Sequence, residues 1–216
     1  MGSTIAGKNR AKMAESLWRD THFTRDEVIG LLGVFEAEAK GEKMDRSKFR
    51  DFLHKEFGLT EDIMLDRVFR VFNEENDGNL SMREWIMGLS KIKGTPKEQI
   101  DFCFKVYDIN GAGYLTREGI QHLLKDCMVK SATEEDADEN EKEIVDIVMK
   151  KMDEDHDGKI SPLDYETAVL KEGCLLIEAF GKCLPDRKIV DEFIQKSMQR
   201  MDQQSFNHYQ LVSPSQ

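Results

Sequence analysis

Apolar side chains recur along this chain with the spacing of α-helices. No stretch shows the sustained alternation of apolar and polar residues that a half-buried strand requires. Three short β-like stretches, at 79–81, 114–116 and 159–161, each follow a glycine. The pattern therefore predicts an all-α chain with strand contacts of two or three residues. The helical faces include Val68, Phe69 and Phe72, then Phe104 and Tyr107, then Val145, Val148, Met149 and Met152.

Helix start signals precede several of these faces. Thr24 with Glu27, and Thr95 with Glu98, have the spacing of a capping box, in which side chain and backbone satisfy each other's donors. Thr60 precedes two acidic residues, which favour the positive end of a helix dipole. The acidic segment 134–143 allows two interpretations, a solvated connector or the start of a helix.

An internal repeat begins at Asn73, Asp108 and Asp153. Each copy has an aromatic residue or methionine one and four residues before it, glycine at its sixth position and an aliphatic residue at its eighth. A new helical face follows each copy. This is the pattern of the helix–loop–helix calcium motif, the EF-hand, whose oxygen donors stand at loop positions 1, 3, 5, 7, 9 and 12.

The spacing follows from the needs of a hard cation. Ca²⁺ takes six to eight oxygens, and a short loop surrounds it only if alternate side chains point inward and glycine makes the sharp turn. Position seven offers a backbone carbonyl, and position twelve closes the shell with a carboxylate from the next helix. The aliphatic residue at position eight is expected to form a short β contact with a sister loop.

Loop 153–164 matches this pattern best. Its closing residue is aspartate rather than the usual glutamate, which favours one-oxygen closure and competition by Mg²⁺. Ser161 stands at position nine, which often binds through water. The predicted metal ligands are Asp153, Asp155, Asp157, the carbonyl of Lys159, and Asp164.

Loop 73–84 departs further from the pattern, with asparagine at position one and glutamate at position three. Three carboxylates remain, so the sequence predicts Ca²⁺ binding here; a structural relic is the alternative. The predicted ligands are Asn73, Glu75, Asp77, the carbonyl of Asn79, and Glu84.

Loop 108–119 keeps Asp108, Asn110 and Tyr114 but has lost two ligands. Ala112 stands at position five and Gly119 at position twelve. One ligand carboxylate is left, so we expect a weak or lost metal site.

A fourth, earlier unit lies around residues 35–53 and has no Asp-x-Asp pattern. Met44 stands at its pairing position, and Lys48 stands where the closing acid belongs. We expect a hand without metal that serves as the structural partner of loop 73–84. The predicted organisation is an N-lobe at 22–90, a C-lobe at 96–172, a C-terminal helical extension at 173–202 and a mobile tail at 203–216.

Charge and composition exclude several function classes. The 216 residues carry a formal net charge of −11, which argues against nucleic-acid binding by bulk electrostatics. Neither a membrane-spanning apolar run nor a secretory signal is evident. The four scattered cysteines favour a reduced intracellular chain. No catalytic constellation is evident around the five isolated histidines, so we expect no enzyme activity.

The acidity is concentrated where cations are expected. Loops 73–84, 108–119 and 153–164 have net charges of −3, −1 and −4, and segment 134–143 has −6. Eleven methionines suit adaptable grooves that accept partner helices, although ordinary core packing is the plainer explanation for any one of them. Sensor hands open such a groove on binding metal, whereas buffer hands barely move. A Ca²⁺ buffer and an EF-hand regulatory subunit of an enzyme are the alternatives to a sensor.

The order of the hands, with a degenerate first and three recognisable ones, resembles the neuronal calcium sensor group. A ciliary member of that group is more similar still, over about residues 10–190. The segments that carry this similarity are 57–70 (FGLTEDIMLDRVFR), DEDHDGKIS with Asp164, and 178–186 (EAFGKCLPD).

The resemblance implies a Ca²⁺ sensor of cilia and sperm flagella. It implies binding to the heavy chain of axonemal outer-arm dynein, with tubulin of the microtubule as a further candidate partner, and control of microtubule sliding. The group is often N-myristoylated; here Gly2 is present, but Ala6 replaces the Ser/Thr of the signal, so we expect no myristoylation.

Overall fold

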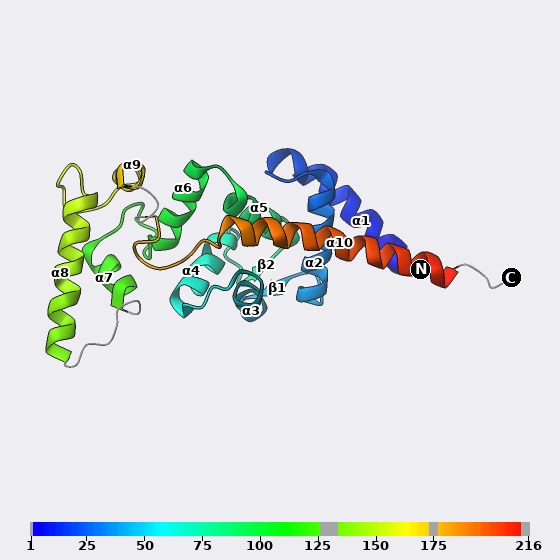
Figure 1. Cartoon of the computed structure of the whole chain (residues 1–216), viewed down its shortest axis with the longest axis horizontal. Helices are drawn as coiled ribbons and strands as arrows, with labels where there is room; N and C mark the ends of the chain where they lie inside the picture. Colours follow the sequence, from blue (N-terminus) through cyan, green and yellow to red (C-terminus); the bar gives the residue numbers. More distant parts are fainter. Residues whose placement is uncertain (1, 126–133, 173–176, 213–216) are drawn as a thin grey trace. The chain divides into compact units, whose positions relative to one another are not determined.

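The computed structural model describes the backbone of residues 2–125, 134–172 and 177–212, and the side chains of 10–124, 142–172 and 177–200. Ten α-helices and two strands of two residues each make up these segments, which confirms the predicted all-α class (Figure 1). No described helix combines the length and apolarity needed to cross a bilayer. The elements are α1 (Gly2–Leu17), the 3₁₀ turn η1 (Trp18–Asp20), α2 (Arg25–Ala39), β1 (Met44–Asp45), α3 (Arg46–Phe57), α4 (Asp62–Phe72), β2 (Asn79–Leu80), α5 (Met82–Lys93), α6 (Pro96–Tyr107), α7 (Arg117–Lys125), α8 (Glu134–Met152), α9 (Pro162–Glu172) and α10 (Arg187–Val212).

The helices begin where the start signals predict. Thr24 and Thr95 form complete capping boxes with Glu27 and Glu98, ahead of α2 and α6. Helix α8 begins at Glu134, so the acidic segment 134–143 is the start of a helix and not a connector.

The predicted β contacts form at position eight of the loops. In the strand pair β1–β2, Met44 lies opposite Leu80 in antiparallel register. Leu115 and Ile160 form an isolated antiparallel bridge, with N–O distances of 2.8 and 3.0 Å between their backbones. The hands are therefore joined in pairs, and the first hand contributes its strand without having an acidic loop.

Two compact units divide the chain, and the first comprises residues 1–58, 72–93 and 185–216. Its core is built from aromatic rings that meet mostly edge to face. The indole N–H of Trp85 donates to the carbonyl of Leu31 at 3.2 Å, which satisfies the buried polar atom. The rings in this core belong to Phe35, Phe49, Phe52, Phe57, Phe72, Trp85 and Phe193.

Helix α10 packs against α2 within this unit, as Figure 1 shows. Gly30 of α2 permits the close approach, because a Cβ there would lie 3.0 Å from Ser197 Oγ and 3.2 Å from the Ser197 carbonyl carbon.

The C-terminal part of the chain differs in part from the predicted helical extension at 173–202, since its helix α10 begins only at Arg187. Helix α10 continues into the predicted mobile tail at 203–216 as far as Val212, since it meets no proline before Pro214; the mobility of that tail stays a prediction. Residues 173–176 and 213–216 lie outside the described segments.

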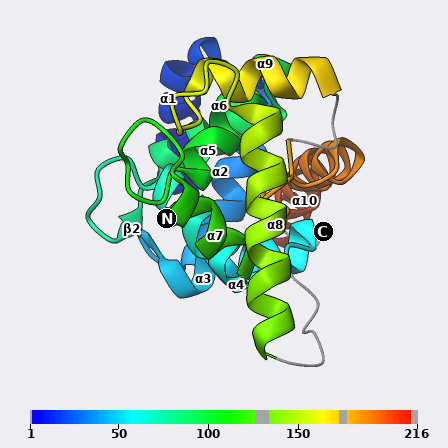
Figure 2. The ribbon, with the colours of Figure 1, turned by 90° about the vertical axis from the view of Figure 1, so that its left-hand side faces the viewer.

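The second unit comprises residues 59–71 and 94–184. Helix α4 belongs to it, although the predicted N-lobe at 22–90 includes that helix. Helix α7 packs beside α8, and α6 against α9 (Figure 2). The hydroxyls of Tyr107 and Tyr165 both donate to the carbonyl of Ile177, at 3.0 and 2.8 Å, and so hold the segment before α10 against α6 and α9.

Two thiols lie buried in this second core. The sulfur atoms of Cys103 and Cys183 are 3.3 Å apart, and both residues are free cysteines. Burial, and then the hydrogen bond with Cys183, raise the pKa of the Cys103 thiol well above its usual value, so it stays protonated at neutral pH. Cys127 and Cys174 lie outside the described residues.

Candidate calcium-binding site

The three loops of the repeat share one backbone frame. Glycine at position six has a φ of 83° at Gly78, 80° at Gly113 and 84° at Gly158, a region that residues with a Cβ rarely adopt. The residue at position nine starts the following helix: the hydroxyls of Ser81, Thr116 and Ser161 accept the backbone N–H three residues on. The frame therefore survives in loop 108–119, although two of its ligand positions hold Ala112 and Gly119.

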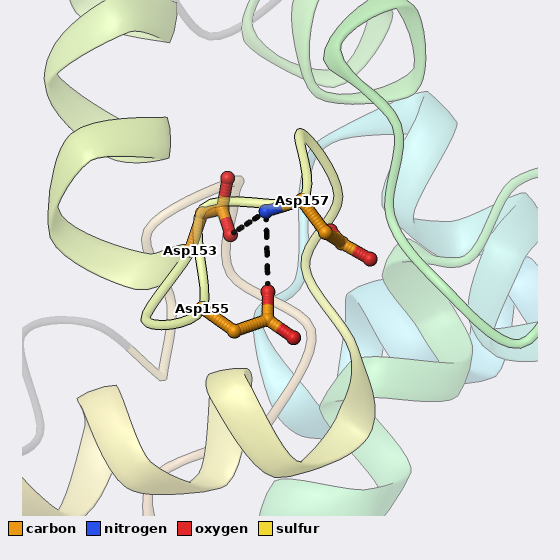
Figure 3. A group of neighbouring side chains, drawn as sticks. All are labelled: Asp153, Asp155 and Asp157. Carbon is orange, nitrogen blue, oxygen red and sulfur yellow. Dashed lines mark hydrogen bonds between the residues drawn. The ribbon is translucent and has the colours of Figure 1, made fainter.

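Loop 153–164 gathers three carboxylates at one point. Oxygens of Asp153, Asp155 and Asp157 all lie within 4.8 Å of one another, which is the one such acidic group across the described residues. The backbone N–H of Asp157 donates to Asp153 and to Asp155, each at 3.2 Å (Figure 3). Gly158 N–H donates to the other oxygen of Asp153 at 3.0 Å. Backbone donors thus hold together charges that would otherwise repel.

The closing carboxylate of this loop is turned toward its own helix. Asp164 is 7% exposed, and its Oδ2 accepts from Ser161 N at 2.9 Å and Ser161 Oγ at 2.6 Å. It is not part of the acidic group of the loop. In this arrangement Asp164 caps α9, so the structure brings together three of the predicted side-chain ligands and not the fourth.

Loop 73–84 holds a buried polar atom that lacks a partner. Asn73, at position one, is 5% exposed, and its buried Oδ1 has no hydrogen-bond partner. An unpaired buried acceptor is destabilising by about 1–3 kcal/mol, so it needs an explanation. A cation at the loop centre supplies one, because position one is the first ligand of an EF-hand.

The closing glutamate of this loop is also in place. Glu84 is 6% exposed; its Oε1 accepts from the N–H of Glu75 at 3.0 Å, and its Oε2 from Ser81 N at 2.9 Å. The carboxylate therefore already lies against position three of the loop. Asp77, at position five, accepts from Asn79 N through Oδ1 at 2.9 Å, and its Oδ2 accepts a hydrogen bond from the ammonium of Lys43 in the first hand. That hydrogen bond lowers the pKa of Asp77 and raises the pKa of Lys43.

Loop 108–119 has the frame of a metal site but lacks ligand side chains at positions five and twelve. Asp108 accepts from Ala112 N at 3.0 Å and Gly113 N at 2.8 Å, much as Asp153 does in its own loop. Asn110 and Tyr114 stand at their expected positions, and the ammonium of Lys159 lies 4.2 Å from the Tyr114 ring centre. Loop 108–119 thus retains a structural contact with loop 153–164.

The first hand contains an ammonium group where loops 73–84 and 153–164 have a closing acid. Lys48 Nζ donates to the carbonyl of Ala39 at 2.8 Å and lies 3.4 Å from Asp45. Asp45 in turn accepts the Lys48 N–H, which together with the ammonium lowers the pKa of Asp45. Lys48 therefore bridges the two ends of this loop.

Sequence reasoning missed one further regularity of the repeat. Glu74 forms an ion pair with Lys91 in the hand of loop 73–84. Glu154 forms one with Lys171 in the hand of loop 153–164, at 3.1 Å. Both pairs join loop position two to the helix that follows the loop, α5 or α9, with the same separation of 17 residues. The identical spacing of glutamate and lysine in the two hands could have revealed these pairs in the sequence. The carboxylate at position two therefore holds the loop to its following helix.

Comparisons with known proteins agree with this geometry. Residues 97–170 match the EF-hand domain pair. Calaxin of Danio rerio is 47% identical over 197 residues, covering 87% of this chain and 93% of that protein. Human calaxin is 44% identical over 195 residues, covering 86% and 92%. A calcineurin subunit of Candida glabrata is 31% identical over 169 residues, covering 76% and 91%.

The matches therefore extend well beyond the EF-hand pair. These relatives are regulatory proteins rather than enzymes, and they support Ca²⁺ binding and a calcium-sensor role. The chain belongs to the calaxin family of EF-hand calcium-binding proteins.

Proposed function

We propose that this chain is a Ca²⁺ sensor of cilia and flagella that binds the heavy chain of axonemal outer-arm dynein and adjusts motility. The gathered carboxylates of Asp153, Asp155 and Asp157, inside a calaxin-like chain, carry the metal-dependent part. The resemblance of segments 57–70 and 178–186 to a ciliary calcium sensor supports the dynein partner and the location at the axoneme.

The metal sites that we propose are loops 153–164 and 73–84. In the first, the three aspartates, the Lys159 carbonyl and Asp164 surround Ca²⁺. In the second, the orphaned Oδ1 of Asn73 is satisfied, and four further groups complete the shell: Glu75, Asp77, the carbonyl of Asn79, and Glu84. Loop 108–119 takes no metal and stays as the β partner of loop 153–164.

The position-twelve carboxylates connect metal binding to helix movement. A bound Ca²⁺ supplies two positive charges at the loop centre. Asp164 must then turn from its cap contacts with Ser161 toward the loop, and because it lies in the first turn of α9, that helix shifts with it. Glu84 already contacts the backbone of Glu75, so α5 needs less movement. Loop 153–164 is therefore the stronger conformational switch.

We further propose that Mg²⁺ competes at loop 153–164. Aspartate is shorter than glutamate and favours closure through one oxygen, which suits the six-fold geometry of Mg²⁺. Asp164 stands apart from the three gathered carboxylates, in keeping with this short reach. Isothermal titration of Ca²⁺ at several fixed Mg²⁺ concentrations tests this, and Ca²⁺ binding that ignores Mg²⁺ refutes it.

The test of function is a pull-down from axonemal extract at low and high Ca²⁺, blotted for dynein heavy chain. The disabled variant is D155N/D157N, because asparagine keeps the acceptors for Asp157 N–H and Lys159 N–H while removing two ligand charges. The matched control is E154Q/E172Q, which removes two charges from ion pairs of the same hand. We expect Ca²⁺-dependent capture of dynein with the wild type and the control, and its loss with the disabled variant.

Two outcomes would point to another function. Failure to capture dynein at any Ca²⁺ level refutes the proposal. Unchanged binding of a hydrophobic dye on Ca²⁺ addition would then favour a buffer, since buffer hands barely open. Capture of a phosphatase catalytic subunit would favour an enzyme regulatory subunit, the function that the similarity to a calcineurin subunit suggests.

A further inference from the structure

The first hand reaches into the ligand set of the second through one lysine. Lys43 precedes β1, and the pairing of β1 with β2 sets its loop beside loop 73–84. Its ammonium contacts Asp77 Oδ2, a predicted ligand at position five. Glu75 and Glu84, two further predicted ligands, also attract this ammonium electrostatically. A single cation thus contacts one of the three carboxylates that would bind metal and is attracted by the other two.

We propose that Lys43 is a tethered competitor of Ca²⁺ at loop 73–84, and that it sets the affinity of that loop. The inference rests on the proposed metal site. An oxygen of Asp77 that contacts an ammonium must leave it before it can enter a metal shell. The contact therefore opposes Ca²⁺ binding, and by linkage Ca²⁺ binding weakens the contact by the same factor.

The observed arrangement of the loop supports this competition. Oxygens of Asp153, Asp155 and Asp157 lie within 4.8 Å of one another, and no ion pair to these three residues is found in the described part of the chain. The acids of loop 73–84 form no comparable group, although Glu84 is already placed. The loops differ at position one, where Asn73 replaces an aspartate, and at position five, where the Oδ2 of Asp77 contacts Lys43. Asp77 is one-third exposed.

The same contact stabilises the metal-free loop. Loop 73–84 carries a net charge of −3, so in the absence of metal its carboxylates repel one another. The ammonium of Lys43 offsets part of this repulsion without filling the cation position. The structure therefore assigns two opposite effects to one residue: support of the metal-free state and resistance to the metal-bound one.

The experiment compares K43Q with K40Q and K43R in the full chain carrying D155N/D157N, so that loop 73–84 is the remaining site. Lys40 is exposed and lies in the same connection, so K40Q changes the net charge equally without touching Asp77. Isothermal titration should show Ca²⁺ bound about two- to fivefold more tightly by K43Q than by K40Q, the size expected for one exposed ion pair. K43R keeps the charge and should stay near the parent chain.

A second readout separates the contact from the metal site. In chelator, K43Q should melt below K40Q, and in saturating Ca²⁺ this order should reverse. Equal Ca²⁺ affinities of K43Q and K40Q, or a melting order that does not change with Ca²⁺, overturn the proposal. If no chain binds Ca²⁺ at loop 73–84, the metal site itself is refuted, and the proposal with it; a lower melting temperature of K43Q in chelator would then still report the Lys43–Asp77 contact.

Discussion

Restoring two ligands should turn loop 108–119 into a metal site. The change is A112D/G119E, which replaces positions five and twelve. Asp108 is already held by the N–H groups of Ala112 and Gly113, at 3.0 and 2.8 Å, so the frame need not be built. A Cβ at Gly119 would meet nothing within 4 Å except Thr116 Oγ1, at 3.3 Å, the hydroxyl that accepts the Gly119 N–H. Ala112 is exposed, so neither substitution begins inside a packed core.

The size of the effect follows from the number of ligand carboxylates. The variant loop has three, as loop 73–84 does, which places its dissociation constant in the sensor range of about 10⁻⁷–10⁻⁵ M. At the weak end of that range, 1 mM Ca²⁺ is about a hundredfold excess and stabilises the folded state by about 2.7 kcal/mol. Replacing glycine inside α7 adds up to about 1 kcal/mol without metal. Only the Ca²⁺-dependent part measures the new site.

The assay is isothermal titration together with calorimetric melting in chelator and in 1 mM Ca²⁺. The matched control is A112D/G119Q, which gains the same helix propensity but lacks the closing charge. We expect one additional Ca²⁺ per chain for A112D/G119E and none for the control. Unchanged stoichiometry, with a melting gain equal to that of the control, would refute the reasoning that only the ligands are missing.

Three further predictions concern the core, the closing residue and the buried thiols. F193A should lower the stability of the first unit by about 3–5 kcal/mol, because the ring packs 5.3 Å from each of two phenylalanines; urea unfolding followed by tryptophan fluorescence measures this, and exposed L170A should change it by less than about 0.5 kcal/mol. D164E should raise the preference of loop 153–164 for Ca²⁺ over Mg²⁺ in competition titrations, and an unchanged ratio would contradict the short-reach argument. Cys103 and Cys183 should resist iodoacetamide until the chain unfolds, since both are buried; peptide mass spectrometry of native chain that shows rapid labelling at either would contradict the packing.

The sequence predicted the loops well because their frame is local. Glycine at position six, the aliphatic residue at position eight and the hydroxyl at position nine each act within a few residues, so spacing alone revealed them. The pairings of Met44 with Leu80 and of Leu115 with Ile160 followed from that frame. The ligand roles of the individual residues stay predictions.

The long-range contacts were not predictable in the same way. The helical period shows that α10 has an apolar face, but it does not show that α2 covers this face. Gly30 allows the two helices to approach closely, because a Cβ there would lie 3.0 Å from Ser197 Oγ, yet the glycine alone does not identify its partner. The Lys43–Asp77 contact joins residues 34 positions apart and leaves no periodic signal. Helix α4 groups with the second unit for a similar reason, since its partners are set by packing and not by the motif.

The two lysines of the first hand contact different partners, one within their own loop and one in loop 73–84. Lys48 stands at position twelve and bridges Asp45 and the carbonyl of Ala39, so a covalently attached cation joins the two ends of that loop at every Ca²⁺ concentration. Lys43 reaches across to Asp77, in a loop whose remaining ligands are intact. The first contact is permanent because its loop has no acidic ligand set to receive Ca²⁺. The second is exchangeable because it competes for a ligand that Ca²⁺ also needs. The first hand thus supplies loop 73–84 with a strand partner through β1. It also supplies the ammonium with which, in our proposal, Ca²⁺ competes for Asp77.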